Sequence, residues 1–220
     1  MSLYKIFTYF AIQSTLAMSG KDYLKDISEI KSMMDKSSRF SSLSGVSGIV
    51  TGIYALIGSL IAYQYVTNNS IQISTIDSYD FILLFVDLAL IILLSLITSF
   101  VITRRKVKKE GISSWNVLTK KMLYNFSILL IPSALYVLIL ILKHDFVGAG
   151  SLMLFFYGAS LINASHNTFK EIKTLGLIEM VLGILIILYP EFTFWLWLIG
   201  AGIVHIIFGI YMYFKHENNS

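Results

Sequence analysis

Long apolar stretches are the feature that most restricts how this chain can fold. Segments such as ILLFVDLALIILLSLI belong to runs of about 20 residues, the length that an α-helix needs to cross a hydrocarbon core of about 30 Å. They do not alternate apolar and polar residues, as the strands of a membrane β-barrel do. The composition agrees, because 56% of the residues are hydrophobic and only 14% are charged. The sequence therefore predicts an all-α polytopic membrane helix bundle in one domain.

Short polar stretches divide the apolar sequence into six segments. We predict that each forms a transmembrane helix, over about Val46 to Val66, Phe81 to Ile102, Met122 to Leu142, Phe146 to Ala164, Thr174 to Tyr189 and Phe192 to Phe214. This assignment gives a cytoplasmic N-terminal segment (1–45), a six-helix transmembrane domain (46–214) and a cytoplasmic tail (215–220).

The distribution of lysine and arginine predicts the orientation of these helices, because positive charges near the ends of spans are retained in the cytoplasm. Of the 17 basic residues, all but one lie before the first span, in the second-to-third and fourth-to-fifth loops, or in the tail. The exception is Lys143, on the opposite side. The stretch TNNSIQISTIDSYD, between the first two spans, has no basic residue. Both termini are therefore predicted to be cytoplasmic.

The densest basic run, RRKVKKEG, is predicted to contact anionic lipid headgroups, where each nearby basic side chain contributes about 1 kcal/mol. The residues are Arg104, Arg105, Lys106, Lys108 and Lys109. The net charge of +4 is thus explained by membrane orientation. Nucleic-acid binding is not expected, since no soluble domain presents an element to a groove. The chain has no cysteine, which excludes disulfides, thiol catalysis and cysteine-ligated metals.

The first residues allow three interpretations. The stretch LYKIFTYFAIQSTLAM resembles the apolar region of a signal peptide and is followed by small residues. Cleavage there would export the basic segment that follows, which argues against a signal peptide and favours an uncleaved cytoplasmic N-terminal segment. Alternatively, Met18 is the true start and residues 1–17 are an upstream extension.

The next stretch, KDYLKDISEIKSMMDKSSRF, has apolar residues at helical spacing and predicts a cytoplasmic amphipathic helix. Such a helix lies in the headgroup plane or docks on the cytoplasmic loops or a partner helix. The apolar positions are Tyr23, Leu24, Ile27, Ile30, Met33 and Met34.

Small residues line one face at the start of the first span. Ser44, Gly48 and Gly52 recur at intervals of four residues and let another helix approach closely. Packing within the chain explains this stripe at least as well as formation of a homo-oligomer.

Three stretches carry a resemblance to a known family. They are DISEIKSMMDKSSRFSSLSGVSGIVTGIYALIG, YGASLINASHNTFKEIKTLGLIEMVLGIL and GAGIVHIIFGIYMYFKHE. Together they resemble an uncharacterised family of bacterial six-span integral membrane proteins, from about Lys25 onward. The last two spans are also similar to HdeD-like membrane proteins. The resemblance implies six spans in a bacterial inner membrane and implies no activity.

The fifth and sixth predicted spans each carry one ionisable group on a glycine-lined face. Glu179 lies between Gly176 and Gly183, and His205 lies between Gly202 and Gly209 with the same spacing. The two helices form a hairpin that turns near Pro190. At a rise of 1.5 Å per residue, Glu179 and His205 differ in depth by only about 4 to 6 Å. The sequence therefore predicts a Glu179–His205 contact.

Asn163, in the small and polar face of the fourth span, is expected to join this pair. Ionisable groups inside a membrane cost several kcal/mol unless they are paired or hydrated, and they often mark functional sites. One interpretation is that the three residues only hold helices together, at about 0.6 to 2 kcal/mol per hydrogen bond. A second interpretation is a proton- or ligand-linked role. A third is a metal site, although two ligands do not complete one.

Asp87 is a second candidate, in the outer part of the second predicted span. Its short side chain is expected to face Tyr63, Gln64 or Tyr136 on neighbouring helices, or to be protonated by burial.

The motifs of common enzymes are missing from the sequence. It has no H-E-x-x-H, no G-x-S-x-G and no phosphate-binding glycine loop. We therefore expect a non-enzymatic membrane protein without a cofactor or metal, a scaffold or sensor that engages a partner protein or the membrane surface. The alternative is a small transporter or proton-linked sensor built on Glu179, His205 and Asn163. An intramembrane enzyme that uses Glu179 and His205 as acid and base is a third interpretation.

Overall fold

The computed structural model describes residues 44–71, 76, 78–109 and 117–217. These residues form helices and no strand, as the apolar pattern predicts. The N-terminal amphipathic helix and the three interpretations of the first residues concern positions 1–43, which lie outside the described residues.

The helices follow the predicted order and extend beyond several of the predicted ends. They are α2 (Gly45–Asn68), α3 (Ser78–Lys109), α4 (Val117–Leu142), α5 (Phe146–Ser165) and α6 (Glu171–Leu188). The last predicted span is divided into a 3-10 turn η2 (Pro190–Phe192), α7 (Thr193–Leu198), a π-helical turn η3 (Ile199–Val204) and α8 (His205–His216). The sequence pattern did not indicate this interruption.

Among the described residues, five helical stretches are long and apolar enough to cross a membrane. They are Gly45–Asn68, Tyr79–Lys106, Val117–Leu142, Phe146–Ser165 and Pro190–His216. In the most apolar 18 residues of the second stretch, no residue is buried within the protein. Apolar surface of this extent is typical of membrane contact. These features suggest a multi-pass membrane protein. Helix α6 differs from the five because its 18 residues include Glu171, Lys173 and Glu179.

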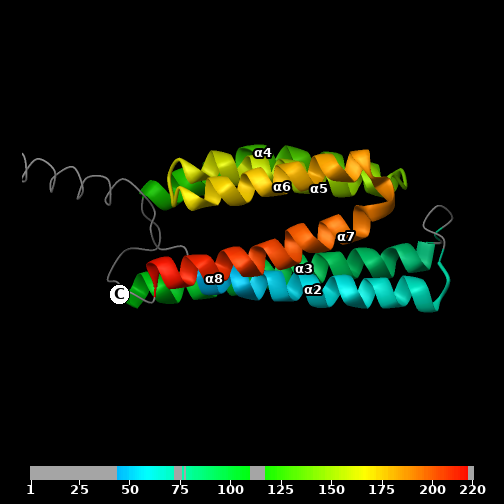
Figure 1. Cartoon of the computed structure of the whole chain (residues 1–220), viewed down its shortest axis with the longest axis horizontal. Coiled ribbons are helices and arrows are strands. Elements are labelled where there is room, and N and C mark those ends of the chain that lie inside the picture. Colours follow the sequence, from blue (N-terminus) through cyan, green and yellow to red (C-terminus); the bar gives the residue numbers. More distant parts are fainter. Residues whose placement is uncertain (1–43, 72–75, 77, 110–116, 218–220) are drawn as a thin grey trace, which may run out of the picture. The chain divides into compact units, whose positions relative to one another are not determined.

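The helices pack in two groups (Figure 1). Helix α5 contacts both α4 and α6, and helix α2 contacts both α3 and α8. The segment formed by α7 and η3 leads from α6 to α8 and contacts α2, α5 and α6. A buried cluster of Leu154, Leu182 and Ile186 lies between α5 and α6. Partly buried residues of α7 and η3, including Leu196 and Val204, pack against it.

Glycines allow the backbones to approach closely within each group. A Cβ atom on Gly176 of α6 would lie 2.5 Å from the carbonyl oxygen of Gly158 on α5. A Cβ atom on Gly52 of α2 would lie 2.7 Å from the carbonyl oxygen of Gly202. One on Gly48 would lie 3.2 Å from the Cα atom of Gly209. The small-residue stripe at the start of α2 therefore packs against η3 and α8 of the same chain.

Adding one methyl group at the α5–α6 contact should destabilise the protein. The Cβ atom of Gly158→Ala would overlap backbone atoms of α6, which cannot rotate away, so we expect a loss of about 1 to 3 kcal/mol in the free energy of unfolding. Gly150→Ala in the same helix is the matched control, because its Cβ atom would meet only Cγ2 of Thr193, at 3.3 Å. Equal melting temperatures for the two purified variants would contradict the proposed role of close backbone packing.

Candidate functional site

The structure brings together Glu179 on α6 and His205 at the start of α8. The Nδ1 atom of His205 lies 3.4 Å from Oε1 of Glu179. Glu179 has no exposed surface and His205 is only 7% exposed. The contact that the sequence predicts between these two side chains is therefore present.

Both ring nitrogens of His205 have hydrogen-bond partners other than Glu179. The Nδ1 atom lies 2.8 Å from the carbonyl oxygen of Gly200, five residues earlier, across the π-helical turn η3. The Nε2 atom lies 2.8 Å from the hydroxyl oxygen of Tyr157 on α5. The two rings also stack, with centroids 5.5 Å apart. Turns of the π type occur frequently at functional sites.

These partners assign the hydrogen atoms on the ring. A carbonyl oxygen only accepts hydrogen bonds, so Nδ1 carries a hydrogen and donates it to Gly200. In the neutral ring, Nε2 then accepts the hydrogen of the Tyr157 hydroxyl. A neutral His205 is thus fully satisfied without Glu179.

The Glu179 carboxyl group, in contrast, lacks hydrogen-bond partners within the described structure. Among the described residues, neither of its oxygens has a hydrogen-bond partner. A buried polar group without a partner costs free energy, and a buried carboxylate without one costs several kcal/mol. The site therefore contains an acidic group that its own surroundings do not stabilise as an anion.

Gly200 and Tyr157 belong to this site and were missed in the sequence. A Cβ atom on Gly200 would lie 2.7 Å from Oε2 of Glu179, so the glycine leaves room for the carboxyl group. Tyr157 precedes the buried Ser160 by about one helical turn, on the same helix as the small and polar face. That spacing is a signal by which Tyr157 could have been found.

Asn163 does not lie with Glu179 and His205. Its Nδ2 atom donates a hydrogen bond to the carbonyl oxygen of Asn125 on α4, at 2.6 Å. Asn125 in turn donates from Nδ2 to Oδ1 of Asn167, at 3.3 Å. The expectation that Asn163 joins the Glu179–His205 pair is not met, because its side chain joins α5 to α4. In the described structure, Asn163 holds helices together.

Asp87 is half-buried on α3 and faces α2. Its Oδ1 atom lies 3.5 Å from the position that a Cβ atom on Gly58 would take. Within the described part of the chain, the expected hydrogen bonds from Tyr63, Gln64 or Tyr136 are not formed. Asp87 thus lies on α3, whereas Glu179 and His205 lie on α6 and α8.

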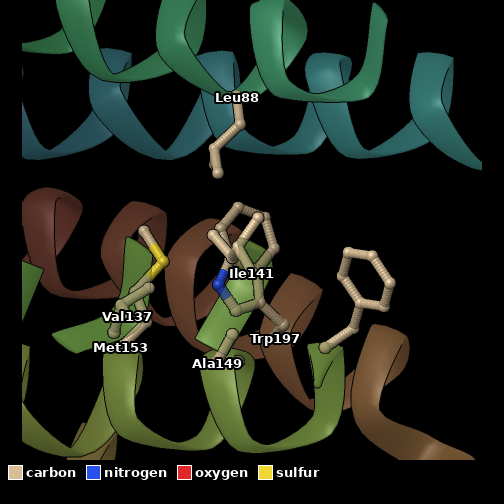
Figure 2. A pocket seen from close by; sticks show the side chains of 8 residues that line it. Leu88, Val137, Ile141, Ala149, Met153 and Trp197 are labelled. Carbon is tan, nitrogen blue, oxygen red and sulfur yellow. The ribbon is translucent and has the colours of Figure 1, made fainter. Parts of the chain in front are cut away.

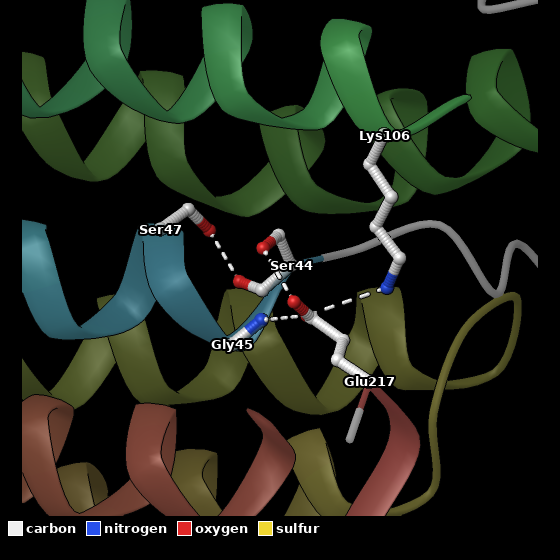
Figure 3. Close-up of polar contacts among 5 residues, drawn as sticks. All are labelled: Ser44, Gly45, Ser47, Lys106 and Glu217. Carbon is white, nitrogen blue, oxygen red and sulfur yellow. Dashed lines mark hydrogen bonds and ion pairs between the residues drawn. The ribbon is translucent and has the colours of Figure 1, made fainter. Parts of the chain in front are cut away.

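A polar junction at the far end of α8 ties together α2, α3 and α8 (Figure 3). The backbone N–H of Gly45, at the start of α2, donates to Oε1 of Glu217 at 2.6 Å, and the Ser44 hydroxyl donates to Oε2 at 3.2 Å. Lys106 forms an ion pair with the same carboxylate, at 3.3 Å. A carboxylate at a helix N-terminus is favoured by the helix dipole.

A second polar contact joins α8 to α6 at this end. Oε1 of Glu171 lies 2.5 Å from Nζ of Lys215 and 3.6 Å from Nε2 of His216. Partial burial opposes the charge on Glu171, but the hydrogen bond and attraction from Lys215, together with His216, outweigh it. They lower the pKa of the carboxyl group below its ordinary value of 4.5. Both acids of α6, Glu171 and Glu179, therefore face bases of α8.

The residues predicted to contact lipid headgroups lie at the C-terminal end of α3. Arg104, Arg105 and Lys108 are exposed, and Lys106 is half-buried in the junction with Glu217. The backbone of Lys109 ends the helix, and its side chain lies outside the described atoms. Over the described ranges, no three His, Asp or Glu side chains gather into a metal site.

Comparisons with protein-family models, curated proteins and solved structures find no match to this chain. The resemblance to bacterial six-span membrane proteins therefore stays a prediction.

Removing the Tyr157 hydroxyl should weaken the site. Tyr157→Phe keeps the stacked ring but leaves Nε2 of His205 buried without a partner, so we expect a loss of about 1 to 3 kcal/mol in stability. Tyr136→Phe on the exposed face of α4 is the matched control. Thermal unfolding of the purified variants measures the difference. A Tyr157→Phe variant as stable as the control would contradict the hydrogen-bond assignment.

Proposed function

We propose that this protein is a non-enzymatic, six-span membrane protein that acts as a proton-linked sensor. In this proposal Glu179, His205, Tyr157 and Gly200 form the sensing site, and the cytoplasmic ends of α2, α3 and α8 transmit its state. The protein would lie in a bacterial inner membrane with both termini in the cytoplasm, and the amphipathic N-terminal helix would engage the membrane surface or a protein partner.

The distribution of side chains along the helices supports this membrane placement. The basic residues of α3, α4, α6 and α8 lie near the helix ends that the positive-inside rule assigns to the cytoplasm. At the opposite ends, Tyr63 of α2 stacks on Phe194 and lies 5.8 Å from the Trp195 ring. Aromatic residues of this kind gather where a protein crosses the membrane surface. Helix α6 is the sixth span in this proposal, with its charges at one end and in the paired site.

The observation that carries the proposal is the unsatisfied Glu179 carboxyl group. A residue kept only to hold helices together would be hydrogen-bonded, as Asn163 is to Asn125. Glu179 is buried more completely than His205 and receives no donor among the described residues. Gaining or losing a proton at this carboxyl changes the charge of the site, and therefore its attraction for His205.

Among the described residues, two other titratable side chains belong to the site of Glu179. They are His205 on α8, 3.4 Å away, and Tyr157 on α5, which bonds the far side of the His205 ring. The other elements packed against α6 near this depth, α7 and η3, have no titratable residue. A charged Glu179 would draw the Nδ1 hydrogen of His205 away from Gly200, and a neutral one would leave it there.

Helix α8 runs from His205 to the end of the bundle that we place in the cytoplasm, so a change in the hydrogen bonding of His205 can reach that end. From His205 to Glu217 the helix spans about 18 Å at 1.5 Å per residue. At its end, Lys215 and His216 contact Glu171 of α6, and Glu217 caps α2 and pairs with Lys106. A small rotation of α8 at His205 would change these contacts next to the basic end of α3.

The proposal is tested by the effect of pH on the amide hydrogen exchange of α8 in the protein reconstituted into lipid vesicles. In the wild type, we expect exchange in α8 to change with pH beyond the intrinsic pH dependence of amides, because the Glu179–His205 contact changes. Glu179→Gln should remove this additional change, since glutamine is similar in size and carries no titratable proton.

Glu191→Gln is the control, because Glu191 is an exposed acid in η2 and should leave the response intact. The sensor proposal fails if Glu179→Gln keeps the wild-type pH response. It also fails if the variant only lowers the melting temperature equally at every pH, which would indicate a residue that merely holds helices together.

A further inference from the structure

A groove of about 150 Å³ lies between the two helix groups, away from Glu179. Leu88 of α3 forms one wall, and residues of α4, α5 and α7 form the other, including Ile141, Ala149 and Trp197. Figure 2 shows Leu88 pointing across the groove toward these side chains. Its lining is almost entirely apolar. An apolar lining offers water few hydrogen-bond partners and therefore favours an apolar occupant.

The groove is partly open, and two of the helices that line it, α3 and α4, carry exposed apolar side chains such as Leu90 and Leu138. In a membrane this surface contacts lipid chains, so a molecule that enters the groove would come from the hydrocarbon region. The polar atom at the wall is the indole nitrogen of Trp197, which can donate a hydrogen bond.

One end of the groove is bounded by the turn from α4 to α5. The groove residues Ile141 and Phe146 flank this turn. The backbone of His144 is left-handed, with φ of 58°, and its ring lies about equally far from Phe81 and Phe146, at 5.9 and 6.0 Å. Asp145 caps α5 by accepting a hydrogen bond from the N–H of Gly148 at 2.9 Å.

Lys143 is the cation in this turn. It is exposed and, among the described residues, makes no ion pair. It is also the one basic residue of the sequence predicted on the outer side of the membrane. A lone cation beside the end of an apolar groove complements a molecule with an anionic head and an apolar chain.

We propose that the groove binds an acyl chain of an anionic phospholipid, with the lipid phosphate at Lys143 and an ester carbonyl within reach of the Trp197 indole. Dispersion contacts with the lining side chains stabilise the acyl chain, because the chain fills a space whose lining would otherwise lack contact partners. The phosphate–lysine attraction selects the headgroup. The proposal depends on the membrane location of the protein and is independent of the protonation of Glu179.

Quenching of Trp197 fluorescence by brominated lipid acyl chains tests this proposal. Trp115→Phe and Trp195→Phe leave Trp197 as the single tryptophan in the full chain. The protein is reconstituted in phosphatidylcholine vesicles that contain a minor fraction of brominated lipid, either phosphatidylglycerol or phosphatidylcholine. We expect brominated phosphatidylglycerol to quench Trp197 more than the same fraction of brominated phosphatidylcholine.

Two variants and two control variants test whether the extra quenching by phosphatidylglycerol comes from lipid bound in the groove. Ala149→Leu fills the groove and should abolish the excess quenching, whereas Ala134→Leu, on the exposed face of α4, should keep it. Lys143→Gln, at an exposed position, should reduce quenching by phosphatidylglycerol to the phosphatidylcholine level. Lys120→Gln, an exposed lysine at the other end of α4, should not.

Equal quenching by the two lipids in the protein without groove substitutions would overturn the proposal. So would an excess that persists in either Ala149→Leu or Lys143→Gln. Because neither residue contacts Glu179, failure here leaves the pH response of α8 untouched, and failure of the sensor proposal leaves the lipid quenching untouched.

Discussion

Close backbone contact between helices is the constraint on which the rest of this structure depends. Helices in a membrane gain little from burying apolar side chains against one another, because lipid is equally apolar, so glycines that permit close approach determine which helices pair. Gly158 and Gly176 join α5 to α6, and Gly48, Gly52 and Gly209 join α2 to the last span. The segment of α7 and η3 contacts both groups, and Gly200 of η3 leaves room for the Glu179 carboxyl group beside His205.

The polar contacts between α6 and α8 differ in how completely they are satisfied. At the start of α6, Glu171 is paired with Lys215 and His216, and its charge is stabilised. In the interior, the π-helical turn η3 places the carbonyl oxygen of Gly200 beside His205, and the imidazole bonds that oxygen and not Glu179. A buried acid in this situation destabilises the fold, whereas an apolar residue of similar size would not. Such a cost is typical of a functional site and not of a structural one.

The apolar pattern predicts the helices because each segment must satisfy its own backbone polar groups inside a membrane. The predicted ends are short at α3 and α4, since these helices continue beyond their apolar parts to Lys109 and from Val117. The Glu179–His205 contact was predictable from glycine spacing and helix rise. The contacts of Tyr157 and Gly200 with this pair were not predictable, because they depend on the π-helical turn. That turn shifts the register of the last span. The partner of Asn163 depends on which side of α5 faces α4, and the Glu217–Gly45 contact joins residues 172 positions apart.

The central claim is that Glu179 exchanges a proton with bulk solvent while the protein stays folded. Infrared difference spectroscopy of the reconstituted protein tests it most directly, because the carbonyl stretch of a protonated carboxylic acid is distinct from the bands of a carboxylate. We predict a pH-dependent band of this kind that is absent from Glu179→Gln and shifted in Tyr157→Phe. A wild-type difference spectrum identical to that of Glu179→Gln across the pH range of the folded protein would contradict the account.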